Sequence, residues 1–209
     1  MISAAAALAR LREGNERFVA SKAAGRMLSR EMASVDAASQ APFAIVLGCS
    51  DSRVPAELVF DQGFGDLFVI RVAGNIVAPS QVGSVEFAAS RFGTRLVVVM
   101  GHTQCGAILA ALDELQGHPS SESENLRSIV DRVRPSVQTV VESGNARDAD
   151  ALIHQAVRAN VRASVDHLRH GSALLERLIA SNGLAIVGAE YSIETGVVDF
   201  FDQRQRETP

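Results

Sequence analysis

Phe43-Ala-Ile-Val-Leu-Gly48 and Arg95-Leu-Val-Val-Val-Met-Gly101 are the two stretches that decide the fold. Each is a short apolar run that ends in glycine, which is typical of a strand buried on both faces of a parallel sheet. The run Asp66-Leu-Phe-Val-Ile-Arg-Val-Ala-Gly-Asn75 has the same character, and residues 80–93 and 106–115 have the spacing of helices. Strands that alternate with helices of this length predict right-handed crossover units and a mainly parallel sheet.

The regions on either side of this α/β segment are rich in helical patterns. Apolar residues at helical spacing in residues 3–20 predict an amphipathic helix, and residues 21–41 predict a loop with at most a short helix. Residues 122–182 predict two or three helices, with a break at Gly144-Asn145 and with Pro135 kinking or starting one of them. This second region is a helical insertion in the α/β pattern.

The chain returns to strand-like sequence near its C-terminus. Residues 184–192 predict a strand, and residues 196–201 predict its partner in a hairpin. No internal repeat and no linker-like stretch divides the sequence. We therefore expect a single α/β domain over residues 1–209, with a mostly parallel central sheet flanked by helices, an N-terminal helix and the helical insertion.

The composition excludes several classes of protein. Of the 209 residues, 47% are hydrophobic and 21% are charged, which is close to the globular average and excludes a disordered chain. No apolar run approaches the roughly 20 residues of a membrane helix. The formal charge is −4 and the basic residues are scattered, so no basic face is available for nucleic acid. The alanine-rich start lacks the basic segment of a signal peptide. Two cysteines are too few for the disulfide scaffold of a small secreted protein. We therefore expect a cytoplasmic protein.

Chemistry-bearing residues directly follow the two strongest predicted strands. The first strand runs into Cys49-Ser-Asp-Ser-Arg53, and the other runs into His102-Thr-Gln-Cys105. Because the carboxyl ends of neighbouring parallel strands meet at one edge of a sheet, the two cysteines and the histidine can converge. Two thiolates and one imidazole are a good zinc set, and three protein ligands leave the fourth position open, as in catalytic sites. The pattern alone leaves zinc hydration chemistry, zinc storage and a Cys–His nucleophile pair open.

Three motifs resemble the β-class carbonic anhydrases: Cys49-Ser-Asp-Ser-Arg53, Phe68-Val-Ile-Arg-Val-Ala-Gly-Asn75 and Gly101-His-Thr-Gln-Cys-Gly106. The resemblance covers most of the chain and is densest between residues 43 and 110. It implies an α/β fold around a mostly parallel sheet, one Zn²⁺ per chain, and assembly into a homodimer or tetramer. Further matching segments are Glu13-Gly-Asn-Glu-Arg-Phe18, Gly83-Ser-Val-Glu-Phe87 and Ala185-Ile-Val-Gly188.

The resemblance also implies an activity, the reversible hydration of carbon dioxide to bicarbonate and a proton by attack of a zinc-bound hydroxide. Cys49, His102 and Cys105 match the permanent zinc ligands of the family. Asp51 and Arg53 match its catalytic pair, in which the arginine holds the carboxylate off the metal; if the pair opens, Asp51 itself becomes a metal ligand. Two thiolates partly cancel the charge of the metal, so we expect an alkaline activity profile.

The substrate pocket is implied by four further matches. Gln40 matches a glutamine that hydrogen-bonds the substrate in one branch of the family, Phe68 and Phe87 match residues of the apolar lining, and Gly106 follows the second zinc cysteine. The chain departs from the family at Phe87, where many relatives have tyrosine. An apolar lining suits carbon dioxide, which is itself apolar.

Other functions compete with this interpretation. A dinucleotide-binding protein and an α/β-hydrolase are disfavoured, because the first strand leads into neither Gly-x-Gly-x-x-Gly nor Gly-x-Ser-x-Gly. Two alternatives use the same zinc ligands: hydrolysis of carbon disulfide or carbonyl sulfide, and a non-catalytic zinc-binding interaction protein. The intact Asp51 and Arg53 argue against the second, because a structural zinc site needs neither residue.

Overall fold

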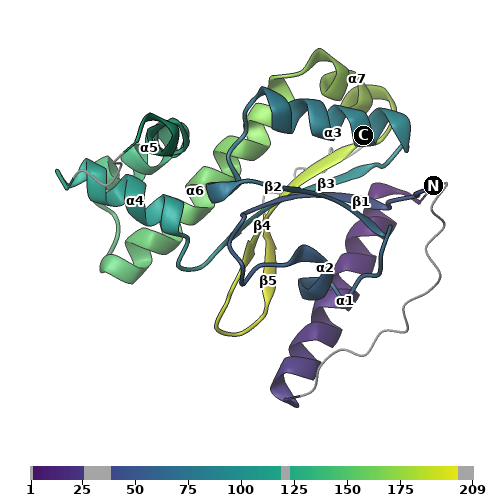
Figure 1. Ribbon diagram of the computed structural model, residues 1–209, viewed down its shortest axis with the longest axis horizontal. Coiled ribbons are helices and arrows are strands. Elements are labelled where there is room, and N and C mark those ends of the chain that lie inside the picture. Colours follow the sequence, from purple (N-terminus) through teal and green to yellow (C-terminus); the bar gives the residue numbers. More distant parts are fainter. Residues whose placement is uncertain (1, 26–38, 119–122, 202–209) are drawn as a thin grey trace.

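A five-stranded sheet forms the centre of the computed structural model, which describes residues 2–25, 39–118 and 123–201 (Figure 1). The strand order is β2-β1-β3-β4-β5. The first four strands pair in parallel, and β5 is antiparallel to β4, so the mostly parallel sheet and the terminal hairpin are confirmed. The strands are β1 (Ala44–Gly48), β2 (Leu67–Arg71), β3 (Leu96–His102), β4 (Ala185–Tyr191) and β5 (Val198–Phe201).

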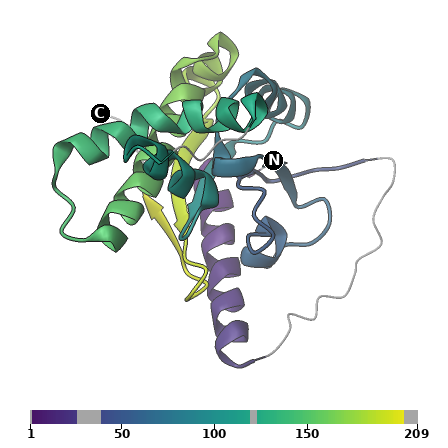
Figure 2. The same ribbon diagram turned by 60° about the vertical axis from the view of Figure 1, so that its left-hand side comes forward.

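Helices cover both faces of the sheet. On one face lie α1 (Ala4–Ala23), the purple helix of Figure 2, and the short α2 (Ala56–Val59). On the other face lie α3 (Pro79–Arg91), α6 (Ala149–His170) and α7 (Ala173–Ser181). Successive residues of β1 and β3 face these two layers alternately and are fully buried. Burial on both faces explains why these strands are continuously apolar in sequence.

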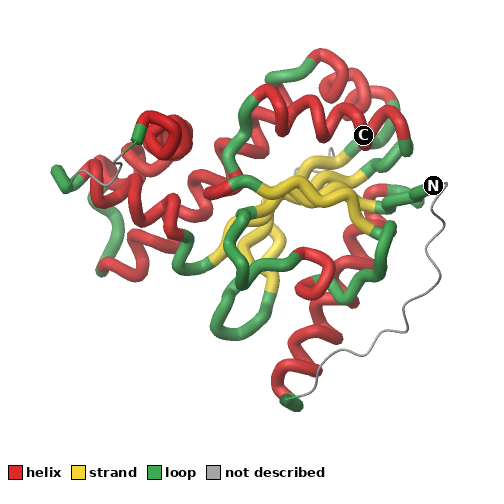
Figure 3. The backbone as a smooth tube through the Cα atoms, in the orientation of Figure 1, coloured by secondary structure: helices red, strands yellow, loops and turns green. Residues whose placement is uncertain are grey.

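A third group of helices lies beyond the carboxyl ends of the strands. Here α4 (Gly106–Leu115) and α5 (Glu124–Ser143) pack against α6, away from the sheet (Figure 3). The side chain of Ser123 caps the start of α5 by accepting a hydrogen bond from a backbone N–H of its first turn, and Gly144 ends the helix in a left-handed conformation. Pro135 lies inside α5 and does not start a helix. The insertion over residues 122–182 thus contains three helices in its described part, α5, α6 and α7, which agrees with the two or three that the sequence predicts.

The N-terminal helix is held to the sheet by Asn15. Its side-chain amide donates to the backbone oxygens of Val59 and Gly196 at 3.1 and 2.9 Å, and its oxygen accepts from the N–H of Val198 at 2.9 Å. At the preceding position, any side chain on Gly14 would overlap the carbonyl oxygen of Phe60. The helix extends to Ala23, and most of the predicted loop after it (residues 26–38) lies outside the described residues.

Within the described ranges, none of the helices combines the length and the apolar character that crossing a bilayer requires.

Candidate metal centre

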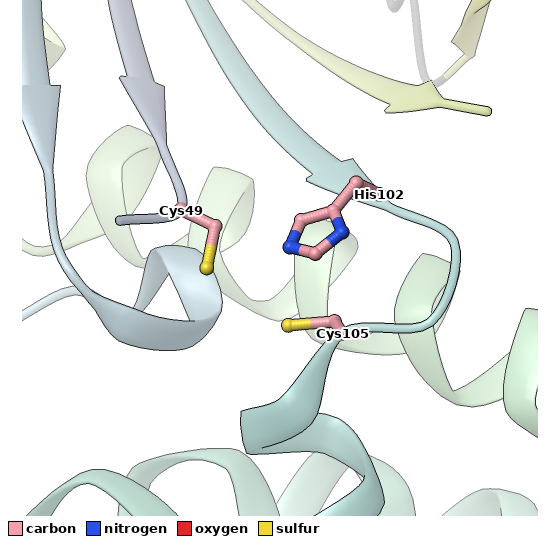
Figure 4. A group of neighbouring side chains, drawn as sticks. All are labelled: Cys49, His102 and Cys105. Atoms are coloured by element: carbon pink, nitrogen blue, oxygen red, sulfur yellow. The ribbon is translucent and has the colours of Figure 1, made fainter. Parts of the chain in front are cut away.

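Three potential metal donors converge where β1 and β3 end. Cys49 directly follows β1, His102 is the last residue of β3, and Cys105 immediately precedes α4. The two strands are neighbours in parallel register, with Gly48 opposite Met100, so their ends lie side by side. The two sulfurs and a ring nitrogen of His102 all lie within 4.8 Å of one another, and the three residues are buried (Figure 4).

The hydrogen bonding of His102 fits a metal ligand. Its Nδ1 lies 2.8 Å from the carbonyl oxygen of Thr103, which can only accept, so Nδ1 carries the proton and the lone pair is on Nε2. Nε2 is buried and has no hydrogen-bond partner among the described residues. Buried polar atoms are nearly always satisfied, so an orphaned nitrogen beside two sulfurs fits a bound cation. Nitrogen and sulfur donors in a set of three favour zinc with an open fourth position.

The two cysteines act on each other electrostatically. A hydrogen bond from the Cys105 thiol lowers the pKa of Cys49 to about 4, against the opposing effect of burial, and contacts with His102 and two backbone N–H groups lower it further. The same hydrogen bond, together with burial, raises the pKa of Cys105. These shifts favour the thiolate form of Cys49, and a divalent cation would supply the charge that stabilises a second thiolate at Cys105.

A carboxylate is fixed beside the three donors by an arginine. Asp51 Oδ1 accepts hydrogen bonds from the backbone N–H and the Nε of Arg53, both at 2.9 Å, and Oδ2 accepts from Nη2 at 2.7 Å. These bonds from Arg53, opposed by burial, hold the pKa of Asp51 well below its usual range. Asp51 Oδ2 lies 4.0 Å from His102 Nε2. The carboxylate thus stays ionised next to the nitrogen that faces the metal position.

Comparison with known proteins agrees with this geometry. The carbonic anhydrase family model matches residues 44–198, which is more than half of the chain. The chain belongs to the β-carbonic anhydrase family. Carbonic anhydrase 2 of Mycobacterium tuberculosis is 38% identical over 186 residues, which cover 89% of this chain and 87% of the relative. The carbonic anhydrase of Mycolicibacterium smegmatis is 36% identical over 189 residues, or 90% of this chain and 89% of the relative.

Solved structures of β-carbonic anhydrases share the fold. A structure from a study of two tetrameric enzymes of the ascomycete Sordaria macrospora superimposes with a TM-score of 0.72 at 25% identity, over 79% of this chain and 83% of that one. The β-carbonic anhydrase of Coccomyxa superimposes with a TM-score of 0.65 at 27% identity, over 89% of this chain and 78% of that one. The fold and the family predicted from the sequence are thereby confirmed.

Three residues that the sequence analysis did not single out hold the loops of this β-carbonic anhydrase site. Arg71, at the end of β2, donates from Nε to the carbonyl oxygen of Cys49 at 3.0 Å and from Nη2 to that of Asp51 at 2.6 Å. Thr103 donates to Glu194 Oε2 at 2.7 Å, which ties the loop between His102 and Cys105 to the β4–β5 hairpin. Arg71 lies within a family-like motif, whereas Thr103 and Glu194 are 91 residues apart and no local pattern reveals their contact.

The four predicted substrate residues lie in different places. Gly106 begins α4 directly after Cys105. Phe68 is near the amino end of β2, where its ring packs on those of Phe87 and Phe92 with centroids 6.2 and 6.1 Å away. Gln40 is exposed and precedes β1, at the end of the strand opposite to the metal donors. Of these four residues only Gly106 adjoins the metal centre within one chain, and the substrate role of all four stays a prediction.

Proposed function

We propose that this protein catalyses the reversible hydration of carbon dioxide to bicarbonate and a proton at one Zn²⁺ ion held by Cys49, His102 and Cys105. The observation that carries the proposal is a three-donor set with an open fourth position next to an ionised carboxylate whose orientation is fixed. When bound, zinc would lower the pKa of a coordinated water, which makes hydroxide available as the nucleophile at a much lower pH than in bulk water.

Asp51 and Arg53 orient the reacting water in this proposal. Arg53 donates two hydrogen bonds to Oδ1 of Asp51 and one to Oδ2, so Oδ2 keeps a lone pair that can accept a further hydrogen bond. Because its pKa is far below neutral, Asp51 accepts a hydrogen bond and does not donate one throughout the working range of pH. A water held in the open position would therefore direct its hydrogen to Asp51, which would leave a lone pair of its oxygen free for the carbon of carbon dioxide.

The Asp51–Arg53 pair also favours an enzyme over a non-catalytic zinc protein. Zinc sites that only stabilise a fold are closed by four protein ligands, whereas this buried set has three and an adjacent carboxylate bound to arginine. Hydrolysis of carbon disulfide or carbonyl sulfide uses the same ligands. Those gases are therefore alternative substrates in the assay.

The test is stopped-flow carbon dioxide hydration on metal-quantified protein from roughly pH 6.5 to 9, with Asp51→Ala beside the wild type. We expect about one zinc per chain, activity that rises towards alkaline pH because two thiolates weaken the acidity of the metal, and a loss of about 100-fold in the variant. Bound zinc without hydration at any pH would contradict the proposal. Activity on carbon disulfide or carbonyl sulfide would then identify the alternative enzyme.

We further propose that residues 1–209 form a single domain, that the protein is a homodimer or tetramer, and that it works in the cytoplasm. Assembly is supported by two large apolar side chains on the surface, Phe64 with 69% and Phe87 with 54% of their area exposed. A cytoplasmic location is supported by the two cysteines, which are unpaired and serve the candidate metal centre. Carbon dioxide and bicarbonate are the partners that the proposed reaction requires.

A further inference from the structure

One face of α6 lies directly behind the metal centre. Residues 157, 160, 161 and 164 follow the spacing that places side chains on one side of a helix. Val157 and Val161 pack against the backbone of Gly101, the residue before His102, where even a methyl group would come within 2.7 Å of Val161. Asn160 and Ser164 are polar, yet both are almost completely buried. Buried polar side chains need partners, and these two find them in a single short turn.

That turn is Ala73–Asn75, a 3₁₀ turn that follows β2. Asn160 Nδ2 donates to the carbonyl oxygen of Gly74 at 2.8 Å, and Ser164 Oγ donates to that of Asn75 at 3.1 Å. Gly74 has φ of 69° and Asn75 has φ of 42°, so two successive residues are in the left-handed region. Glycine adopts this region freely and asparagine adopts it more readily than most residues, but both have other conformations open to them, so the contacts around the turn select this one. The two side chains of α6 supply such contacts.

The same 3₁₀ turn also contacts a metal donor. The backbone N–H of Gly74 donates a hydrogen bond to Cys49 Sγ at 3.3 Å. A methyl group on Gly74 would lie 2.9 Å from the side chain of Ala107 in α4, so the turn is closely confined on the side away from α6. Hydrogen bonds to a coordinating thiolate withdraw electron density from the sulfur and fix its direction, which tunes the bond between sulfur and metal.

We propose that Asn160, assisted by Ser164, is a positioning residue of the metal centre. It holds the carbonyl group of Gly74 so that the N–H of the same residue stays on Cys49 Sγ, and it thereby sets how strongly this thiolate donates to the metal. The proposal rests on the metal centre proposed above and adds a control element on α6, separated from Gly74 by 86 residues of sequence. Neither side chain touches the reacting atoms.

The test replaces zinc by Co²⁺, whose thiolate charge-transfer absorption reports the electron density of the coordinating sulfurs. In Asn160→Ala the N–H···S hydrogen bond is released, the sulfur becomes richer in electrons, and the charge-transfer band moves to longer wavelength. Hydrogen bonds that hold the metal ligands in place also contribute to metal affinity, so we expect the metal dissociation constant to rise by roughly 10–100-fold in this variant. Ser164→Ala removes one hydroxyl group and shifts both quantities in the same direction by less.

Val165→Ala is the matched control, because Val165 is fully buried on the same helix but packs in the cluster between the sheet and α6. This variant lowers Tm and leaves the band and the metal affinity as in the wild type. If Asn160→Ala has the same charge-transfer band and the same metal affinity as the wild type, the proposal is overturned. If Asn160→Ala does not fold, the same comparison is made with Ser164→Ala, and an unchanged band and affinity there would overturn the proposal. A wild-type protein without any thiolate charge-transfer band would instead overturn the metal centre itself, which keeps the two failures distinguishable.

Discussion

Arg53 determines how the carboxylate of Asp51 meets the metal centre. Replacing it by methionine removes the two side-chain hydrogen bonds that hold the carboxylate, and the pKa of Asp51 rises from well below its usual range towards the ordinary value of about 4. Even then Asp51 is ionised at neutral pH. We therefore expect Arg53→Met to lower carbon dioxide hydration by roughly 10–100-fold, because the freed carboxylate either loses its orientation or becomes a metal ligand itself.

Arg10 offers the control for this prediction. Arg10 lies on α1, away from the three metal donors, and its Nη2 lies 2.7 Å from Oδ1 of Asp66, so it too forms an arginine–aspartate pair. Stopped-flow rates of Arg10→Met should equal those of the wild type. Wild-type rates in Arg53→Met would contradict the positioning role.

At the scale of elements, the attachment of α1 depends on a single glycine. A side chain at Gly14 would overlap the carbonyl oxygen of Phe60, and the neighbouring Asn15 could then no longer reach the backbone of β5 and α2. Gly14→Ala should therefore lower the free energy of unfolding by about 1–3 kcal/mol, as substitutions at other overpacked sites do.

The control for this prediction is Gly83 in α3, which has no described atom near an added methyl group. Gly83→Ala should therefore raise the free energy of unfolding by up to about 1 kcal/mol through helix propensity. Urea unfolding of both variants checks the opposite signs, and a stable Gly14→Ala would contradict the docking of α1.

The sequence predicts the central strands and the convergence of the three donors because both depend on local patterns. Apolar runs report burial on two faces, and donors that follow neighbouring parallel strands must meet at one edge. The short α2 and the turn at Ala73–Asn75 were missed, because four and three residues are too few for a periodic signal. The contact between Asn160 and Gly74 has no local signature either, since an asparagine inside a helix is ordinarily solvated and its partner here is determined by the tertiary fold.

For the molecule as a whole, three of the predicted substrate residues, Gln40, Phe68 and Phe87, lie far from the metal donors, towards the opposite end of the sheet within one chain. Gln40 precedes β1 and Cys49 follows it, and the strand between them extends by about 13 Å. The Phe68–Phe87–Phe92 cluster lies beside β2, one of the two edge strands of the sheet, and Phe87 is largely exposed. If these residues line the pocket, a second copy of the chain must bring them to the metal centre, across a two-fold interface that places the amino end of one sheet against the carboxyl end of the other.

This arrangement predicts complementation between two inactive variants. Gln40→Ala and Asp51→Ala should each lose about 100-fold in hydration, because each removes one polar contact made in the transition state. In a random mixture of the two chains half of the dimers are mixed, and each mixed dimer holds one site with both residues intact, so the mixture should recover about a quarter of the wild-type activity. Refolding the chains together and measuring stopped-flow rates tests this, with light scattering to confirm a mass of two or four chains. A mixture no more active than the average of its components, or a mass of one chain, would mean that Gln40 serves no site on a partner chain.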